Sequence, residues 1–140
     1  MPLEAIAYAS KATKRLTVAE LNDLVQRASA VNKIAGVTGL LLYDGARFLQ
    51  YFEGPDDGMA TVYARILNST LHSDVIELAR GRVGRRRMPY WSMRWVLADM
   101  YKFNEAAFSD WSSFVRHSGE NHRVPSGVDR LHALAAPYLE

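Results

Sequence analysis

The 140-residue sequence contains no cysteine, which excludes a disulfide framework, a thiolate metal site and a cysteine nucleophile. No apolar run approaches the roughly 18 residues that a membrane-spanning helix needs. The first ten residues, MPLEAIAYAS, also lack the basic and then apolar pattern of a secretory signal. We therefore expect a cytoplasmic protein without a membrane contact. The four histidines have no close ligand spacing, so no metal site is predicted.

Positive and negative side chains nearly balance. A formal net charge of +2 is too small to indicate a nucleic-acid partner. Five arginines gather in Arg80–Arg87, RGRVGRRR, which is either a solvated hairpin loop or a surface for an acidic partner. The sequence has no nucleotide-binding glycine loop and no G-x-S-x-G nucleophile motif. We therefore predict that the chain is not an enzyme.

What is present is an alternation of strand and helix patterns. Leu3–Ser10 reads as a strand, and Thr17-Val-Ala-Glu20 is a capping box that opens a helix, which Gly36 ends. Leu40–Leu42 and Phe48–Glu53 read as two strands joined by the turn signal Asp44-Gly45.

The remaining elements complete a known order. A second helix follows Asp56-Asp57, and its predicted core face consists of Met59, Val62, Tyr63 and Ile66. Val75–Val83 and Ser92–Ala98 are the fourth and fifth strands. The order predicts an α+β, ferredoxin-like βαββαβ fold with an added fifth strand, in which the first and third strands are neighbours.

The last forty residues change character. Asn104 is predicted to cap a helix, and a final helix follows the loop Ser118–Ser126. The apolar residues assigned to these two helices are Phe108, Trp111, Phe114 and Val115, and then Val128, Leu131, Leu134, Ala135 and Tyr138. We expect residues 1–98 to form one domain and residues 99–140 a helical extension packed on the outer face of the sheet. Contact with a second copy or a partner is the alternative.

Gln50 breaks the pattern of its strand. Phe48, Gln50 and Phe52 share one face, so the Gln50 amide should be buried and would cost about 1–3 kcal/mol if it lacked a partner. Tyr8 on the first strand is placed to meet it, and Asn32 closes the first helix. These residues indicate either a core hydrogen bond with a helix-terminal asparagine, or a planar polar ligand held between Leu24 and Ile66.

With these residues the sequence resembles the BLUF family, the sensors of blue light using FAD. The resemblance covers about Leu3 to Leu97 and depends on Tyr8, Asn32 and the block GVTGLLLYDGARFLQYFEGP. It continues through Tyr63-Ala-Arg65-Ile66, His72 and the Pro89–Met93 segment.

The resemblance implies non-covalently bound FAD and a role for each matching residue. Tyr8 would be the photochemical electron donor, and Gln50 would bridge it to the flavin. Trp91 and Met93 would lie near Gln50 and report its state outward. The remaining residues would contact the cofactor: Asn32 at the pyrimidine edge, Leu24 and Ile66 on the ring faces, and Arg65 and His72 beside it.

Some positions depart from the family pattern. Val31 stands where many members have a second polar residue. Ala28 and Ser29 stand where a Ser-Arg pair is common, and Ser69 where an aspartate is common. The resemblance implies a stand-alone photoreceptor with a light-driven Tyr–Gln–flavin hydrogen-bond switch. Its signal would reach an unknown protein partner or a second copy through the fifth strand and the C-terminal helices. The alternative is a ferredoxin-like protein- or nucleic-acid-interaction module that carries no flavin.

Overall fold

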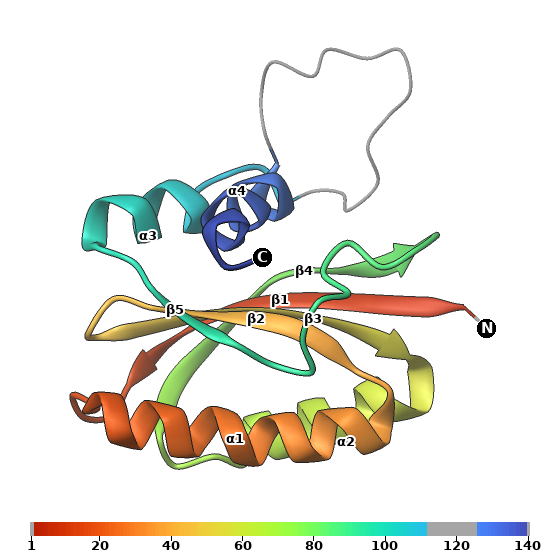
Figure 1. The fold of residues 1–140 in the computed structure, drawn as a ribbon, viewed down its shortest axis with the longest axis horizontal. Helices are drawn as coiled ribbons and strands as arrows, with labels where there is room; N and C mark the ends of the chain where they lie inside the picture. The colour runs from red at the N-terminus through yellow and green to blue at the C-terminus, as the bar shows by residue number, and fades with distance from the viewer. Residues whose placement is uncertain (1, 112–125, 140) are drawn as a thin grey trace.

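A five-stranded mixed sheet forms the centre of the molecule, in a computed structural model that describes residues 2–111 and 126–139. The strand order is β4-β1-β3-β2-β5, and only β5 runs parallel to its neighbour. This confirms the predicted ferredoxin-like plan with a fifth strand (Figure 1). The strands are β1 (Leu3–Ala12), β2 (Thr38–Tyr43), β3 (Arg47–Pro55), β4 (His72–Val83) and β5 (Trp95–Leu97). The helices are α1 (Val18–Ala35), α2 (Asp56–Leu67), α3 (Met100–Ala107), α4 (Gly127–Ala135) and the short 3₁₀ helix η1 (Ala136–Tyr138).

The ends of α1 follow from its sequence. The side chain of Thr17 accepts a hydrogen bond from the Glu20 N–H, and the Glu20 carboxylate accepts one from the Thr17 N–H. Gly36 ends the helix in the left-handed region, at φ 75°, where a side chain would be strained. The predicted capping box and stop are confirmed. Asn32 therefore sits in the last turn of α1.

The β2–β3 hairpin fixes the register of the central strands. The Asp44 carboxylate accepts hydrogen bonds from the N–H groups of Ala46 and Arg47, which holds the turn. In the resulting register Gln50 lies opposite Leu41 on one side and Tyr8 on the other. The predicted meeting of Tyr8 and Gln50 across neighbouring strands is confirmed.

The sheet has a hydrophobic core on each face. On one face α1 and α2 cover a cluster that includes Ile6, Tyr8 and Phe52 (Figure 1). On the other face α3 and α4 pack on a cluster that includes Ala7 and Tyr51. Because strand side chains alternate, each central strand contributes to both cores.

The C-terminal region corrects one predicted helix. α3 begins after Asp99, whose carboxylate accepts from the Lys102 N–H, so Asn104 lies inside the helix instead of capping it. Phe108 is 81% exposed, and Trp111 is buried beyond the helix end. Phe114, Val115 and residues 118–125 of the predicted loop lie outside the described residues. The predicted final helix is confirmed as α4.

Two strand boundaries also differ from the prediction. β4 begins at His72, three residues earlier than expected, because it continues to pair with β1. β5 is only Trp95–Leu97. The preceding segment still follows β2 irregularly, since the carbonyls of Trp91 and Arg94 accept hydrogen bonds from Gly39 and Leu41.

The Arg80–Arg87 segment forms polar contacts with the end of α1, with β3 and with α4. The Arg86 guanidinium donates to the carbonyls of Gly36 and Glu53, and Arg87 pairs with Asp129 on α4. The buried Glu53 carboxylate accepts from the N–H groups of Arg87 and Met88 at 2.9 and 2.7 Å. These contacts give the segment a structural role inside the protein.

Close contact between α1 and α2 predicts a stability effect at Gly58. A Cβ atom there would lie 2.1 Å from the carbonyl oxygen of Ala35, so Gly58→Ala should lower the free energy of unfolding by about 1–3 kcal/mol. Gly84→Ala is the matched control, because a Cβ there meets no atom within 4 Å. Urea denaturation should show this control unchanged or stabilised by up to about 1 kcal/mol. Equal stability of the two variants would contradict the close packing.

Candidate functional site

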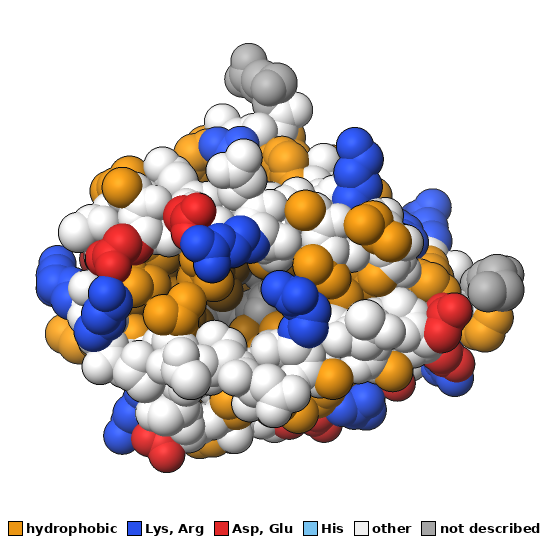
Figure 2. All heavy atoms as spheres, turned by 90° about the horizontal axis from the view of Figure 1, so that it is seen from below, with side chains coloured by type: hydrophobic (Ala, Val, Ile, Leu, Met, Phe, Trp, Pro, Cys, Tyr) orange, Lys and Arg blue, Asp and Glu red, His pale blue; other side chains and the backbone are white. Residues whose placement is uncertain are grey.

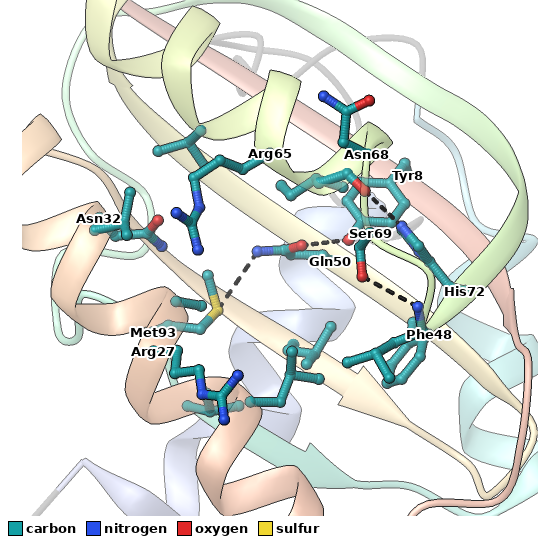
Figure 3. A pocket seen from close by; sticks show the side chains of 18 of the residues that line it. Tyr8, Arg27, Asn32, Phe48, Gln50, Arg65, Asn68, Ser69, His72 and Met93 are labelled. Atoms are coloured by element: carbon teal, nitrogen blue, oxygen red, sulfur yellow. Dashed lines mark hydrogen bonds between the residues drawn. The ribbon is translucent and has the colours of Figure 1, made fainter.

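A cavity of about 670 Å³ opens between α1, α2 and the sheet. It is hollowed into the face seen in Figure 2, where basic side chains flank the opening. Its volume is in the range of small-molecule and cofactor sites. Its lining side chains come from α1, α2 and strands β1 to β4, together with the loop after α2 and Met93 before β5. Figure 3 shows how the labelled residues surround the cavity.

Tyr8 and Gln50 form the polar centre of the cavity floor. The Tyr8 hydroxyl donates a hydrogen bond to Gln50 Oε1, and both side chains are buried. Burial raises the pKa of the Tyr8 phenol far above its ordinary value, with a smaller contribution from nearby Tyr63. Tyr8 is therefore a neutral hydrogen-bond donor at any physiological pH.

The other end of the Gln50 amide faces Met93. Gln50 Nε2 lies 3.6 Å from Met93 Sδ, and Met93 is 6% exposed. Thioether sulfur is a weak acceptor, so this contact stabilises the amide less than the bond to Tyr8 does. Gln50 is thus held firmly at its oxygen and loosely at its nitrogen.

Asn32 links the cavity to the same segment as Met93. Its Nδ2 donates to the carbonyl of Ser92 at 2.8 Å, and the residue is 2% exposed. The αL turn at Gly36 ends α1 just after Asn32 and so fixes where this amide sits. Asn32 therefore contacts Ser92, and Gln50 contacts Met93, the next residue of the same segment.

His72 occupies the far end of the cavity. Its Nδ1 is hydrogen bonded to Ser10 Oγ at 2.7 Å, and its Nε2 to the carbonyl of Ile66 at 2.7 Å. Both ring nitrogens have protein partners, and these two hydrogen bonds link the end of α2 to β1. The imidazole ring itself lines the cavity. The ring lies 5.8 Å from that of Tyr8.

The cavity walls are apolar, with cationic residues among the lining. Leu24 on α1 and Ile66 on α2 line it from opposite helices. Arg27 and Arg65 also line it, one from each helix (Figure 3). Guanidinium groups are the side chains best suited to phosphate oxygens. A planar, polar, phosphate-bearing molecule therefore fits the residues that are present.

The structure brings most of the predicted site residues together. Eight of them line this one cavity: Tyr8, Leu24, Asn32, Gln50, Arg65, Ile66, His72 and Met93. Trp91 is the exception, because it packs on the core of the opposite sheet face and contacts Tyr90 and Arg94. The expected position of Trp91 beside Gln50 is therefore wrong for this structure. Its part in photochemistry stays a prediction.

Sequence reasoning missed Arg27. It lies three residues after Leu24 and four before Val31, on the α1 face that lines the cavity, so helical periodicity carried the signal. The first turn of α1 does not take part in the cavity, and its apolar residue Val18 is 62% exposed. Val18 lies in the first turn of α1, whereas the cavity-lining residues of that helix begin at Leu24.

Residues 3–94 match the family model described as "BLUF: Sensors of blue-light using FAD". The chain belongs to the BLUF family of flavin-binding blue-light sensors.

Similar proteins include both short and long chains. A solved structure titled "BlrB - a BLUF protein, dark state structure" is 30% identical, with a TM-score of 0.69 over 99% of this chain and 98% of that chain. Klebsiella pneumoniae BlrP1 with FMN and cyclic diGMP is 32% identical, with a TM-score of 0.62 over 71% of this chain and 26% of that chain.

Two curated relatives are much longer than the matched region. Photoactivated adenylate cyclase subunit beta of Euglena longa is 31% identical over 62% of this chain and 10% of its own length. The blue light- and temperature-regulated antirepressor BluF of Escherichia coli K12 is 30% identical over 54% of this chain and 19% of its own length. The match thus spans a tenth to a fifth of these relatives.

Within residues 2–111 and 126–139, no helix is long and apolar enough to cross a membrane. Within the same ranges, no group of histidine, aspartate and glutamate residues is arranged to hold a metal ion.

Asn32 is a buried amide in the lining of the cavity, so its truncation should reduce flavin affinity. Asn32→Ala should weaken flavin binding by about tenfold to a hundredfold, the equivalent of one buried hydrogen-bonding group. Asn68→Ala, an exposed amide at the same cavity, is the matched control and should bind within about threefold of the unchanged protein. Restoring a polar neighbour with Val31→Asn should tighten binding. Titration of apoprotein with flavin gives the dissociation constants, and equal values for all variants would contradict the role of Asn32.

Proposed function

We propose that this chain is a blue-light photoreceptor that binds FAD non-covalently and signals through a light-driven Tyr8–Gln50–flavin hydrogen-bond switch. The signal leaves toward a protein partner through β5 and the C-terminal helices. The observation that carries the proposal is the Gln50 amide, held between the Tyr8 hydroxyl and Met93 at the floor of a cofactor-sized cavity.

FAD is the cofactor that the lining favours. Arg27 and Arg65 give the cavity two guanidinium groups, which suit the phosphates of a nucleotide-bearing flavin. When bound, the flavin supplies blue-light absorption and an electron-accepting excited state. Leu24 and Ile66, which line the cavity from α1 and α2, would hold its ring between them, and Asn32 would orient one polar edge.

Tyr8 is placed to be the electron donor. Its phenol is buried and neutral, and its O–H already points at Gln50 Oε1. An oxidised phenol is strongly acidic, so loss of an electron sends the Tyr8 proton along this bond toward Gln50. Return of the electron and of a proton restores the neutral Tyr8 phenol and leaves the Gln50 amide turned over or in its tautomeric form.

Turning the amide changes what Met93 contacts. In the described state Gln50 Nε2 donates to Met93 Sδ. After rotation the amide oxygen would face the sulfur, and two acceptors do not attract each other. The Met93 side chain therefore loses its polar contact and shifts, which makes the segment before β5 the first backbone to respond.

That segment is attached to the C-terminal helices. The Arg94 guanidinium lies between the rings of Trp91 and Tyr138, 5.2 and 4.4 Å from their centres. Tyr90 is also hydrogen bonded to His132 on α4 at 2.9 Å. A movement of Met93 is thus transmitted within one or two residues to contacts with α4 and η1, which lie on the sheet face opposite the cavity.

Gln50→Leu tests the switch. Leucine fills similar space without an amide, so the variant should keep its flavin and lose the reversible red shift after blue light. Tyr8→Phe should also bind flavin and stop photoconverting, at a stability cost of about 1 kcal/mol. Absorbance spectra before and after illumination measure both effects. Gln26→Leu, at an exposed position on α1, is the control and should shift normally. A normal shift in Gln50→Leu would contradict the proposal.

The output route predicts a separation of photochemistry from signalling. Met93→Leu keeps the buried volume and removes the sulfur acceptor, so the flavin shift should persist. Light-induced hydrogen exchange in Ser92–Leu97 and α4 should become smaller than in the unchanged protein. Met88→Leu, buried on the opposite sheet face, is the control. Exchange maps that change with light only around the cavity in the unchanged protein would contradict this route.

A further inference from the structure

Tyr63 is a second tyrosine in contact with Tyr8. The ring centres lie 6.4 Å apart with an angle of 35° between the planes. Tyr63 comes from α2 and packs on the same core cluster as Tyr8, yet it is not among the residues that line the cavity. It is half-buried, whereas Tyr8 is only 3% exposed. Tyr63 therefore connects the buried photochemical tyrosine to the protein surface.

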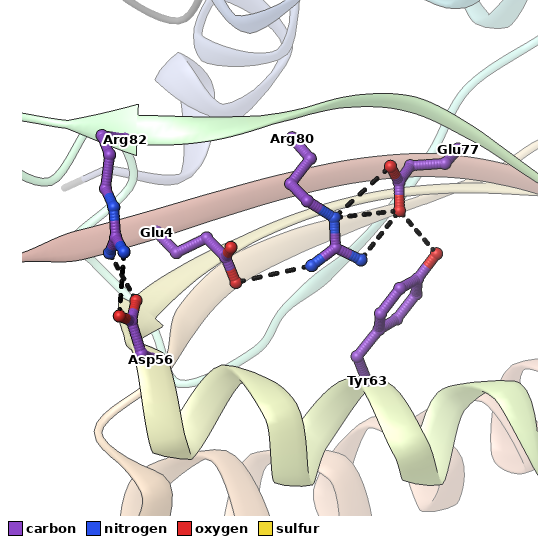
Figure 4. Close-up of polar contacts among 6 residues, drawn as sticks. All are labelled: Glu4, Asp56, Tyr63, Glu77, Arg80 and Arg82. Carbon is purple, nitrogen blue, oxygen red and sulfur yellow. Dashed lines mark hydrogen bonds and ion pairs between the residues drawn. The ribbon is translucent and has the colours of Figure 1, made fainter.

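The Tyr63 hydroxyl has a proton acceptor. It donates to Glu77 Oε1 at 3.1 Å, as Figure 4 shows. Burial raises the pKa of the Tyr63 phenol, and the Glu77 charge raises it further, so the phenol keeps its proton at rest. Arg80 donates to the same carboxylate at 2.9 Å and lies 3.6 Å from Glu4.

A register shift creates this arrangement. Ala7 pairs with Ala79 on β4 but Tyr8 pairs with Glu77, so Leu78 is an extra residue in the ladder. Such a bulge redirects the side chains that follow it. Here it puts Glu77 and Arg80 on one side of β4, within reach of Tyr63 (Figure 4).

We propose that Tyr63 is a second electron donor, which reduces oxidised Tyr8 and passes its own proton to Glu77. The inference rests on the proposed role of Tyr8 as the first donor. The oxidising equivalent then moves from the buried Tyr8 to the surface along a side path formed by Tyr63, Glu77 and Arg80.

Electron transfer and proton transfer both take part in this step. One electron moves from Tyr63 to oxidised Tyr8 before the Tyr8 proton leaves, so Tyr8 returns to its neutral phenol. The O–H bond of Tyr63 breaks, and its proton forms an O–H bond on the Glu77 carboxylate. The oxidant is the flavin, which would take up the electron of Tyr8 in its light-excited state and keep it during this step. Tyr63 is left as a neutral phenoxyl radical.

Arg80 does not prevent the proton transfer. Its hydrogen bonds to Glu77 lower the pKa of that carboxyl group, which makes it a weaker base. An oxidised phenol is a far stronger acid than a carboxylic acid, so the proton still moves to Glu77. Once Glu77 is neutral, Glu4 keeps a negative charge beside Arg80, and the cation is not left without a counter-charge.

Spin trapping tests the proposal. Flavin-loaded protein is illuminated with blue light in the presence of a small nitrone trap, and adducts are located by peptide mass spectrometry. We expect a light-dependent adduct on Tyr63, because this residue is half-buried and reachable. Tyr63→Phe should abolish the adduct at this position. Glu77→Gln should reduce adduct formation on Tyr63 by about a hundredfold, the low end of what a positioned proton acceptor contributes.

Two other tyrosines serve as controls. Tyr90→Phe should leave the Tyr63 adduct unchanged, because Tyr90 lies on the opposite sheet face and bonds to His132. Tyr101 is 76% exposed and should carry no adduct, which separates electron transfer from simple accessibility.

The outcomes distinguish this inference from the proposed function. A normal reversible red shift without a Tyr63 adduct would overturn the side path and leave the switch standing. An undiminished adduct in Glu77→Gln would also overturn it. A Tyr63 adduct that persists in Tyr8→Phe would refute both the relay through Tyr8 and its place as first donor.

Discussion

One hydrogen bond between two neutral side chains, Tyr8 and Gln50, sets the requirements for the rest of this molecule. It joins the two central strands of the sheet at a buried position. A buried amide needs a partner, and a charged partner would hold it in a single orientation. The neutral Tyr8 phenol gives the Gln50 amide a partner without holding it in a single orientation. The β1–β3 register, set by the hairpin turn at Asp44, is what allows the pair to meet.

In the proposed function, the sheet separates the site of light detection from the route of the signal. The cavity and the Tyr8–Gln50 pair lie on the face covered by α1 and α2, while α3 and α4 cover the other face (Figure 1). The segment before β5 reaches both. Met93 points to the cavity, and Trp91 and Arg94 contact the C-terminal side. Alternation of side chains along an extended backbone is therefore sufficient to couple the two faces.

Much of the fold could be predicted because its signals are local. The Thr17 capping box, the Gly36 stop and the Asp44-Gly45 turn each act within a few residues, and all three occur as expected. The burial of Gln50 could be predicted because side chains alternate along a strand and Gln50 lies between two phenylalanines on the same face. The start of α3 was missed because Asp99 and Asn104 are both good helix caps, and only the burial of Phe103 against the sheet decides between them.

The rest depends on contacts between distant elements. Trp91 was expected beside Gln50, but Arg94 and Tyr138 hold it on the other face, and η1 lies nearly fifty residues further along the chain. The Tyr63–Glu77 contact depends on the bulge at Leu78, which interrupts the period of two on which strand predictions rest. Neither feature has a signature in the local sequence.

In the proposed switch, light changes the bonding of the Gln50 side chain. The sequence has two glutamines, Gln26 and Gln50, so Gln26→Ala leaves Gln50 as the sole glutamine. Light-minus-dark infrared difference spectra of this variant, grown with and without glutamine labelled with ¹³C at the side-chain carbonyl, report on this one amide. We expect a difference band that shifts with the label and disappears in Tyr8→Phe. A label-insensitive difference spectrum, recorded while the flavin red shift is present, would contradict it.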